Sequence, residues 1–152
     1  MTAERPNYWM GVAARTHVRA AVAGGFAQLG HGKLSAVRSL RPDDWIVYYS
    51  PKTEIDGGEV VQAFTALGRV TGDGAYRVEQ GTDFCPFRVD VEYRKDAADA
   101  SVRPLLPALE LTKNRGTRWG IAFRGSKARL SPADFVVIAE AMGVGEIATA
   151  RL

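Results

Sequence analysis

Cysteine and histidine are scarce in this chain. The single cysteine, Cys85, cannot form an internal disulfide or provide a paired-cysteine metal clip, so a reducing, cytoplasmic setting is expected. The only histidines, His17 and His31, lie fourteen positions apart in different predicted elements. No pair of ligand-type residues has the spacing of a metal site. We therefore expect neither a metal nor any other cofactor.

Long apolar runs are also missing. No segment approaches the roughly 20 apolar residues that a membrane helix needs. The first residues contain no apolar core followed by a small-residue cleavage site. We therefore expect no membrane partner. The 152 residues suit one domain with a core of its own, spanning residues 1–152.

Motifs of nucleotide hydrolysis and covalent catalysis are absent as well. The glycine-rich segment that ends in Gly32-Lys33 has Ala27 where a phosphate-binding Walker loop needs glycine, and Leu34 where it needs Ser or Thr. Cys85 precedes a proline at the start of a predicted strand, but no nucleophile elbow or catalytic triad accompanies it. The sequence therefore predicts a protein that is not an enzyme.

Acidic residues are unevenly distributed. Six Lys or Arg and no acid occur from Arg5 to Arg41, and again from Lys113 to Arg129, although the net charge is only +3. The segment from Asp43 to Glu110 holds 13 acids against 7 bases. Such segregation is typical of a surface that faces a polyanion, although two solvated faces would give the same pattern.

The hydrophobic pattern predicts one α+β domain of short alternating elements. Helices are expected at residues 15–22, ended by two glycines, and from residue 132, capped by a serine. The predicted strands lie at residues 7–13, 45–49, 60–70, 76–78, 87–93 and 119–123. The strand at 45–49 is apolar throughout and is expected to be buried on both faces. The strands at 60–70 and 76–78 are expected to form a hairpin. Five or six short strands between two helices suggest a small twisted barrel.

Two tryptophans suit a ligand-contacting surface. Trp9 lies beside the first acid-free stretch, and Trp119 lies inside the second. An aromatic ring among arginines can stack on a nucleobase while cations hold the phosphates. A tryptophan in a strand is more often part of the core, and this alternative remains open. The hypothesis requires the two indoles to face each other across one slot.

Four ordered motifs resemble the bacterial EVE domain. They are Asn7-Tyr8-Trp9, the segment GGFAQLGHGK at 24–33, the segment RPDDWIVYYSPK at 41–52, and Arg118-Trp119-Gly120 before the last helix. The ordered set covers about residues 7 to 143. One departure is the turn pair Asp43-Asp44, which is usually Gly-Asp. Asp43 must then adopt a turn conformation that glycine takes freely.

The resemblance implies a PUA-like fold, a twisted β-barrel flanked by helices. EVE domains are similar to YTH domains, which hold a methylated base between aromatic rings. In restriction-type proteins, related domains read modified bases beside a nuclease, and this chain would be a reader alone. The implied partner is nucleic acid, DNA or RNA, with a modified cytosine or adenine held without catalysis.

The resemblance also implies a set of site residues. The expected ligand-binding residues are Trp9, Phe26, Gln28, His31, Gly32, Lys33, Tyr49, Ser50, Lys52 and Trp119. Gln28 can pair with a base edge, and Gly32 would allow close backbone approach. From the second basic stretch, the expected phosphate contacts are Arg115, Arg118, Arg124 and Lys127.

Two other functions stay open at this point. A small enzyme acting on a nucleotide or small ligand could use His31, Lys33, Lys52 and Tyr49 for proton transfer. A pocket too narrow for a nucleotide would instead indicate a small-molecule sensor or a docking module.

Overall fold

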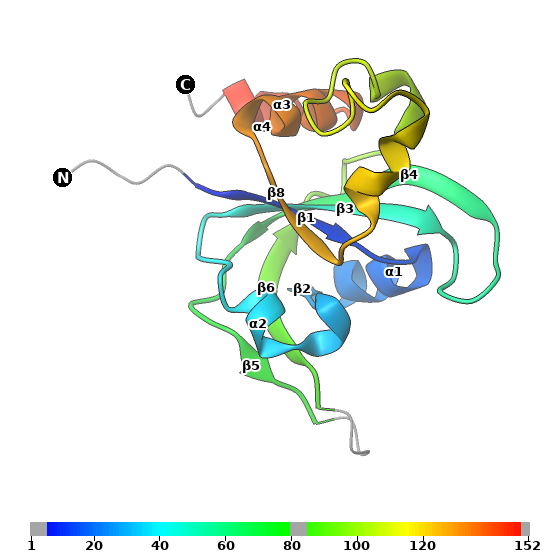
Figure 1. Ribbon diagram of the computed structural model, residues 1–152. Helices are drawn as coiled ribbons and strands as arrows, with labels where there is room; N and C mark the ends of the chain where they lie inside the picture. The colour runs from blue at the N-terminus through cyan, green and yellow to red at the C-terminus, as the bar shows by residue number, and fades with distance from the viewer. Residues whose placement is uncertain (1–5, 80–84, 150–152) are drawn as a thin grey trace.

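A curled mixed sheet forms the centre of the protein in the computed structural model, which describes residues 6–79 and 85–149 (Figure 1). The main path of the sheet runs β2-β6-β4-β3-β1-β8, with β5 paired to β6 and β7 paired to β4. β1 and β3 are parallel, and the other pairs are antiparallel. The strands are β1 (Tyr8–Val12), β2 (Phe26–Ala27), β3 (Trp45–Lys52), β4 (Val60–Val70), β5 (Tyr76–Arg77), β6 (Phe87–Tyr93), β7 (Ala100–Ser101) and β8 (Lys127–Leu130).

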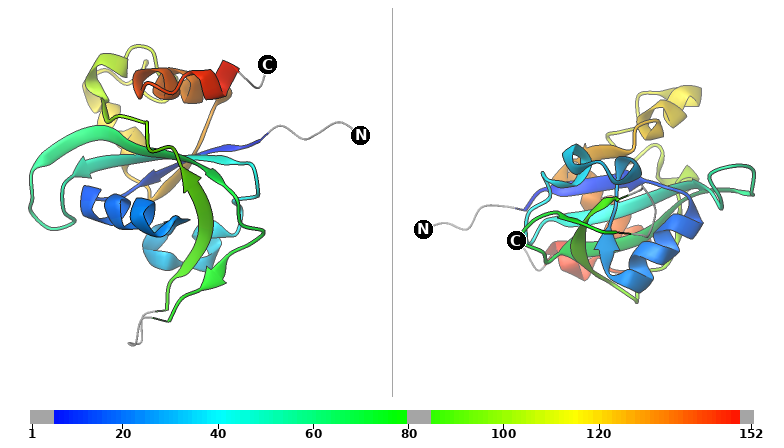
Figure 2. Two further views of the ribbon diagram at one scale, coloured as in Figure 1. Left: turned by 180° about the vertical axis from the view of Figure 1, so that it is seen from behind. Right: turned by 90° about the horizontal axis from the view of Figure 1, so that it is seen from below.

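Helices cover both faces of this sheet. Figures 1 and 2 show α3 and α4 on one face and α1 and α2 on the other. The α-helices are α1 (Arg15–Gly24), α2 (Leu34–Val37), α3 (Pro132–Ala141) and α4 (Glu146–Thr149), and the 3-10 helices are η1 (Gly30–Gly32), η2 (Arg103–Leu105) and η3 (Gly116–Phe123).

Each face of the sheet has its own apolar cluster. The α3 cluster contains Trp45, Val47 and Tyr49 from β3, and the α1 cluster contains Ile46 and Tyr48 from the same strand. Because successive side chains of a strand point to opposite faces, one apolar strand supplies both clusters. The expectation that β3 is buried on both faces is confirmed.

The helix ends follow local chemistry that the sequence predicts. Gly25 ends α1 with a φ of 70°, a left-handed conformation in which glycine carries no steric penalty. At α3, the Ser131 hydroxyl accepts a hydrogen bond from the Asp134 backbone N–H. The Asp134 carboxylate is buried and accepts the backbone N–H groups of Glu110 and Leu111. It therefore ties α3 to the preceding loop as well as favouring the N-terminus of the helix.

The Asp43-Asp44 turn holds the start of β3 against β1. Asp43 has a φ of 72°, so it takes the conformation expected where related turns have glycine. Asp44 is 3% exposed. Its carboxylate accepts hydrogen bonds from the Asn7 N–H at 2.9 Å, the Trp9 indole N–H at 2.9 Å and the Arg41 N–H at 3.0 Å. This carboxylate therefore fixes the orientation of the Trp9 ring.

Two predicted elements are wrong. Residues 119–123 form the end of η3 and not a strand. The rings of Trp119 and Phe123 lie 6.0 Å apart, a contact that residues four positions apart make on a helical turn and cannot make along a strand.

The predicted hairpin between residues 60–70 and 76–78 does not form either. β5 pairs with β6 because the end of β4 already pairs with β3 on one side and β6 on the other.

Candidate ligand pocket

A pocket of about 490 Å³ opens where β1 ends and α1 begins. The segment from β2 to η1 closes it from the α1 side of the sheet. Ile55 from the β3–β4 loop and Ser126 from the turn before β8 complete the rim. Most of the lining is apolar or backbone. The lining residues are Val12, Ala13, Ala14, Thr16, His17, Gln28, Leu29, Gly30, Ile55 and Ser126.

The Gln28 backbone is the best-anchored part of the pocket wall. Its carbonyl accepts hydrogen bonds from His17 Nε2–H at 3.0 Å and from the Tyr48 hydroxyl at 3.5 Å. Since a carbonyl can only accept, His17 carries a proton on Nε2 in this arrangement. The Gln28 side-chain Oε1 accepts from Arg88 Nε at 2.8 Å, and the Arg88 guanidinium stacks over the Phe26 ring at 3.8 Å. These contacts fix both the backbone and the amide of Gln28 before any ligand arrives.

The core beneath the pocket is densely packed. Tyr48 is fully buried, and this burial raises the pKa of its hydroxyl to about 12. Gly11 lies above the Tyr48 ring, and a Cβ at Gly11 would meet Leu29 Cδ2 at 2.5 Å and Tyr48 Cε1 at 2.8 Å. Any larger residue at position 11 would therefore displace Leu29, a pocket residue, or the Tyr48 ring.

A second hollow of about 310 Å³ adjoins the first. The two share the residues from Val12 to Ala14 and the side chain of Ile55. Lys52 and Glu54 belong to the second hollow only. Lys52, predicted at the rim, therefore lies beside the main pocket and not in it.

Most of the predicted glycine-rich loop serves the fold. Gln28 lines the pocket, as the prediction requires for a contact with a base. Phe26 is buried in the α1 cluster. Gly32 has a φ of 80°, and a Cβ there would lie 2.4 Å from Pro86 Cβ, so its close approach is to Pro86. Lys33 is exposed between η1 and α2, and the side chain of His31 lies outside the described part of the chain.

The expected slot between two tryptophans is wrong. Trp9 packs against the α1 cluster, whereas Trp119 packs against the α3 cluster on the opposite face of the sheet. The reason is strand parity: Tyr8 and Met10 point toward α3, so Trp9 between them points the other way. Neither indole lines the 490 Å³ pocket.

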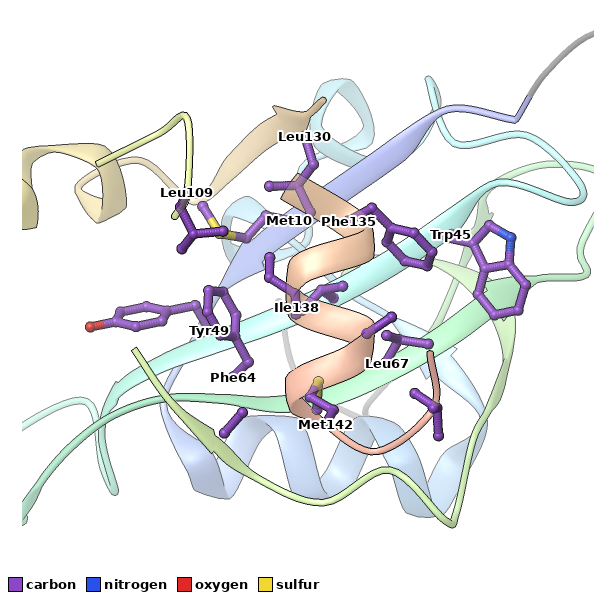
Figure 3. Packing of buried hydrophobic residues seen from close by; sticks show 14 of the residues in the cluster. Met10, Trp45, Tyr49, Phe64, Leu67, Leu109, Leu130, Phe135, Ile138 and Met142 are labelled. Atoms are coloured by element: carbon purple, nitrogen blue, oxygen red, sulfur yellow. The ribbon is translucent and has the colours of Figure 1, made fainter. Parts of the chain in front are cut away.

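Tyr49 and Ser50 do not lie at a pocket rim. Tyr49 is 2% exposed and stacks on Phe123 with ring centroids 4.0 Å apart, inside the α3 cluster shown in Figure 3. Its burial raises the pKa of its hydroxyl to about 12. Ser50 is fully buried, with its hydroxyl 2.8 Å from that of Thr65. The proton-transfer group proposed for an enzyme is therefore not assembled, because Tyr49 and Lys33 lie on different faces of the sheet.

The predicted phosphate contacts are spread over two regions. Arg118 and Arg124 are exposed in and just after η3. Arg115 lines a separate hollow of about 570 Å³ at the start of α3. Lys127, next to the pocket residue Ser126, donates to the Ser39 hydroxyl at 2.7 Å, and its ammonium lies 4.9 Å from the centroid of the Trp9 ring.

Lys127 belongs to a basic edge beside the pocket. Arg129 lies two residues further along β8 and also faces the Trp9 ring, at 5.8 Å, while bonding the Asn7 side chain. Partial burial lowers the pKa of the Lys127 ammonium. We call Trp9, Lys127 and Arg129 the β8 basic edge.

Of the ten residues that line the pocket, the sequence predicted only Gln28, and the nine that it missed include Thr16, His17, Ile55 and Ser126. His17 was weighed only as a metal ligand. Ile55, between Glu54 and Asp56, gave no signal of its own, because single apolar side chains are common at protein surfaces.

The described residues contain neither a cluster of metal ligands nor a membrane-spanning helix. No group of three or more His, Cys, Asp or Glu in that part of the chain could hold a metal ion. Within the same residues, no helix is long and apolar enough to cross a membrane.

Comparison with known proteins agrees with this architecture. The model of the EVE domain matches residues 7–141, so the chain belongs to the EVE domain family. A UPF0310 protein of Mycolicibacterium vanbaalenii is 43% identical over 134 residues, which cover 88% of this chain and 91% of that protein. UPF0310 protein YdcG of Bacillus subtilis is 36% identical over 140 residues, which cover 91% of this chain and 93% of that protein. The resemblance seen in the sequence is confirmed.

Solved structures confirm the PUA-like fold. Rpa0253 of Rhodopseudomonas palustris superposes with a TM-score of 0.56 at 15% identity, over 91% of this chain and 94% of its own. A hypothetical protein from Leishmania major superposes with a TM-score of 0.56 at 12% identity, over 99% of both chains. Membership of the EVE family is consistent with a nucleic-acid-binding module.

Proposed function

We propose that this protein is a nucleic-acid-binding module that holds one nucleobase, plain or modified, in the 490 Å³ pocket. The observation that carries the proposal is the pocket itself. Its volume falls within the range of about 300–1,000 Å³ of small-molecule sites, and its walls are apolar with few fixed polar groups. The partner is DNA or RNA, and we propose a cytoplasmic setting.

The polar groups of the pocket suit a base edge. The Gln28 amide carries two N–H donors, and its oxygen keeps one further acceptor site while it accepts from Arg88 Nε. The apolar residues Val12, Ala13 and Leu29 offer surface to a ring or to a methyl group on it. A methyl group contributes about 0.8 kcal/mol when buried, so discrimination by methyl burial alone is modest.

The β8 basic edge supplies the electrostatic part of the proposal. Lys127 follows the pocket residue Ser126 directly in the chain, and we propose that it contacts the phosphates of a base held in the pocket. Phosphate contacts position a nucleic acid without reading its sequence. We also propose that Arg118 and Arg124 contact phosphates of the nucleic acid further from the bound base. Arg115, the remaining proposed contact, lies beside α3.

The test combines a pocket-filling variant with two ligand types. Ser126→Phe would place a ring in the pocket from an exposed position, and Ser35→Phe adds the same ring on α2 away from it. We expect free nucleosides to raise the thermal midpoint of the wild type and of Ser35→Phe but not of Ser126→Phe. Labelled oligonucleotides should bind the wild type at low salt and weaken as salt rises. Absence of binding by both ligand types would refute the proposal.

A small-molecule sensor remains the second candidate, because the pocket alone does not require a polymer. Tight binding of a nucleoside together with no binding of oligonucleotides at low salt would favour it.

A further inference from the structure

Ile55 is an exposed apolar side chain at the mouth of the pocket. It is 75% exposed, and it lines both the 490 Å³ pocket and the neighbouring 310 Å³ hollow. Apolar surface left in water at a pocket mouth becomes favourable to bury once a ligand arrives. Ile55 therefore has a ligand-facing position without any role in the core.

The loop that carries Ile55 is closed and tied down at its base. The Thr53 N–H donates to the Glu59 carbonyl at 2.9 Å, and the Glu59 N–H donates to the Thr53 hydroxyl at 2.9 Å. The Thr16 N–H donates to the Thr53 carbonyl at 3.1 Å, which links the loop to α1. Gly58 has a φ of 73°, and a Cβ there would meet Thr53 Oγ1 at 2.5 Å. The loop therefore presents Ile55 from a fixed base, so that little ordering is needed on binding.

The rim of the pocket is electrostatically asymmetric. Residues 53–59 hold three carboxylates, on Glu54, Asp56 and Glu59, and no Lys or Arg. All three residues are exposed. Another part of the rim, at Ser126, lies within the acid-free stretch that continues into the β8 basic edge. Because the three loop carboxylates outnumber the neighbouring cation Lys52, a phosphate on the loop side would meet a net like charge, and a phosphate on the β8 side would meet opposite charge.

We propose that the loop of residues 53–59 is the selectivity element of this pocket, an inference that rests on the proposed function. Ile55 covers an uncharged base from one side. The loop carboxylates keep phosphate away from that side, so the backbone of the nucleic acid leaves the pocket over the β8 basic edge. The loop therefore selects an uncharged ring for the pocket and sets the direction in which the nucleic-acid strand leaves it.

The first test removes the apolar side chain of Ile55. Ile55→Ala should weaken binding of free nucleosides roughly tenfold. The variant loses three carbons, and we expect the bound nucleoside to bury about half of their apolar surface, at about 0.8 kcal/mol for each fully buried carbon. Val60→Ala is the matched control, because Val60 is 71% exposed at the other end of the same loop and lines neither hollow. The probes are cytidine, adenosine and their base-methylated forms, titrated calorimetrically. Both variants should keep the thermal midpoint of the wild type, since neither side chain is buried.

The second test removes the charge. The triple variant Glu54→Gln, Asp56→Asn and Glu59→Gln should bind a labelled single-stranded oligonucleotide roughly three- to tenfold more tightly at low salt, with nucleoside affinity changed less than about twofold. The control triple variant carries the same change in net charge at exposed positions that line neither hollow: Asp73→Asn, Glu79→Gln and Glu92→Gln.

The outcomes separate the two proposals. If the wild type binds nucleosides and Ile55→Ala binds them equally well, the cover is refuted and the proposed function stands. Equal gains in the two triple variants would refute the local exclusion of phosphate. If the wild type binds neither nucleosides nor oligonucleotides, the proposed function fails and the loop inference fails with it.

Discussion

Replacing Asp44 by alanine tests how the start of the sheet is held together. The buried carboxylate accepts three hydrogen bonds, from the Asn7, Trp9 and Arg41 donors, at 2.9 to 3.0 Å. The alanine removes the carboxylate that these three donors share. A hydrogen bond to a charged group contributes about 1.5–3 kcal/mol, and an orphaned buried donor costs about 1–3 kcal/mol. Because the three bonds share one carboxylate and are not additive, we expect a loss of about 3–5 kcal/mol.

Urea denaturation followed by tryptophan fluorescence measures this loss directly. A loss of this size is a large share of the roughly 5–15 kcal/mol that stabilises a domain. Asp44→Asn is the graded control, because it keeps one acceptor oxygen and turns the other into a donor that faces donors. It should fall between the wild type and Asp44→Ala. A loss below about 1 kcal/mol for Asp44→Ala would mean that water satisfies the three donors, and the reasoning would be refuted.

Three further predictions concern strain, pH and charge. Gly32→Ala should destabilise the fold by about 2–4 kcal/mol in urea denaturation, because a Cβ would be strained at a φ of 80° and would overlap the proline already packed there; an unchanged midpoint would contradict this. Tyr48 and Tyr49 have pKa values raised from 10.0 to about 12, so their contribution to stability is complete below pH 10 and is lost as pH rises toward 12, at about 1.4 kcal/mol per pH unit for each ring. Ultraviolet titration should show Tyr48 and Tyr49 ionising near pH 12, and ionisation of every tyrosine near pH 10 in the folded protein would count against their burial. Lys127→Ala should lower the slope of log affinity against log salt for single strands by about 0.7, whereas Lys95→Ala, an exposed lysine on the turn after β6, should leave it unchanged.

Local sequence patterns determined several of the elements and their ends. The run from residue 60 to 70 and the alternation from 87 to 93 predict β4 and β6 at their observed bounds. Ser131 caps α3 and Gly25 ends α1 because capping depends on residues within a few positions. The positive φ of Asp43 followed from a single comparison with the usual Gly-Asp turn. Family membership followed from the order of four motifs, and one of the predicted site residues, Gln28, lines the pocket.

Tertiary structure alone decided which side chains share a face and a cavity. Trp9 and Trp119 each lie near basic residues in the sequence, but strand parity sends Trp9 to the α1 side while η3 packs Trp119 on the α3 side. The pocket joins residues near position 13, position 28, position 55 and position 126. β1 lies between β3 and β8, which brings the first, third and fourth of these segments together, and the curl of the sheet brings the segment after β2, at the other end of the strand order, to the same place. Local periodicity carries no information on such long-range pairing, since burial of distant apolar faces against one another fixes the order of the strands.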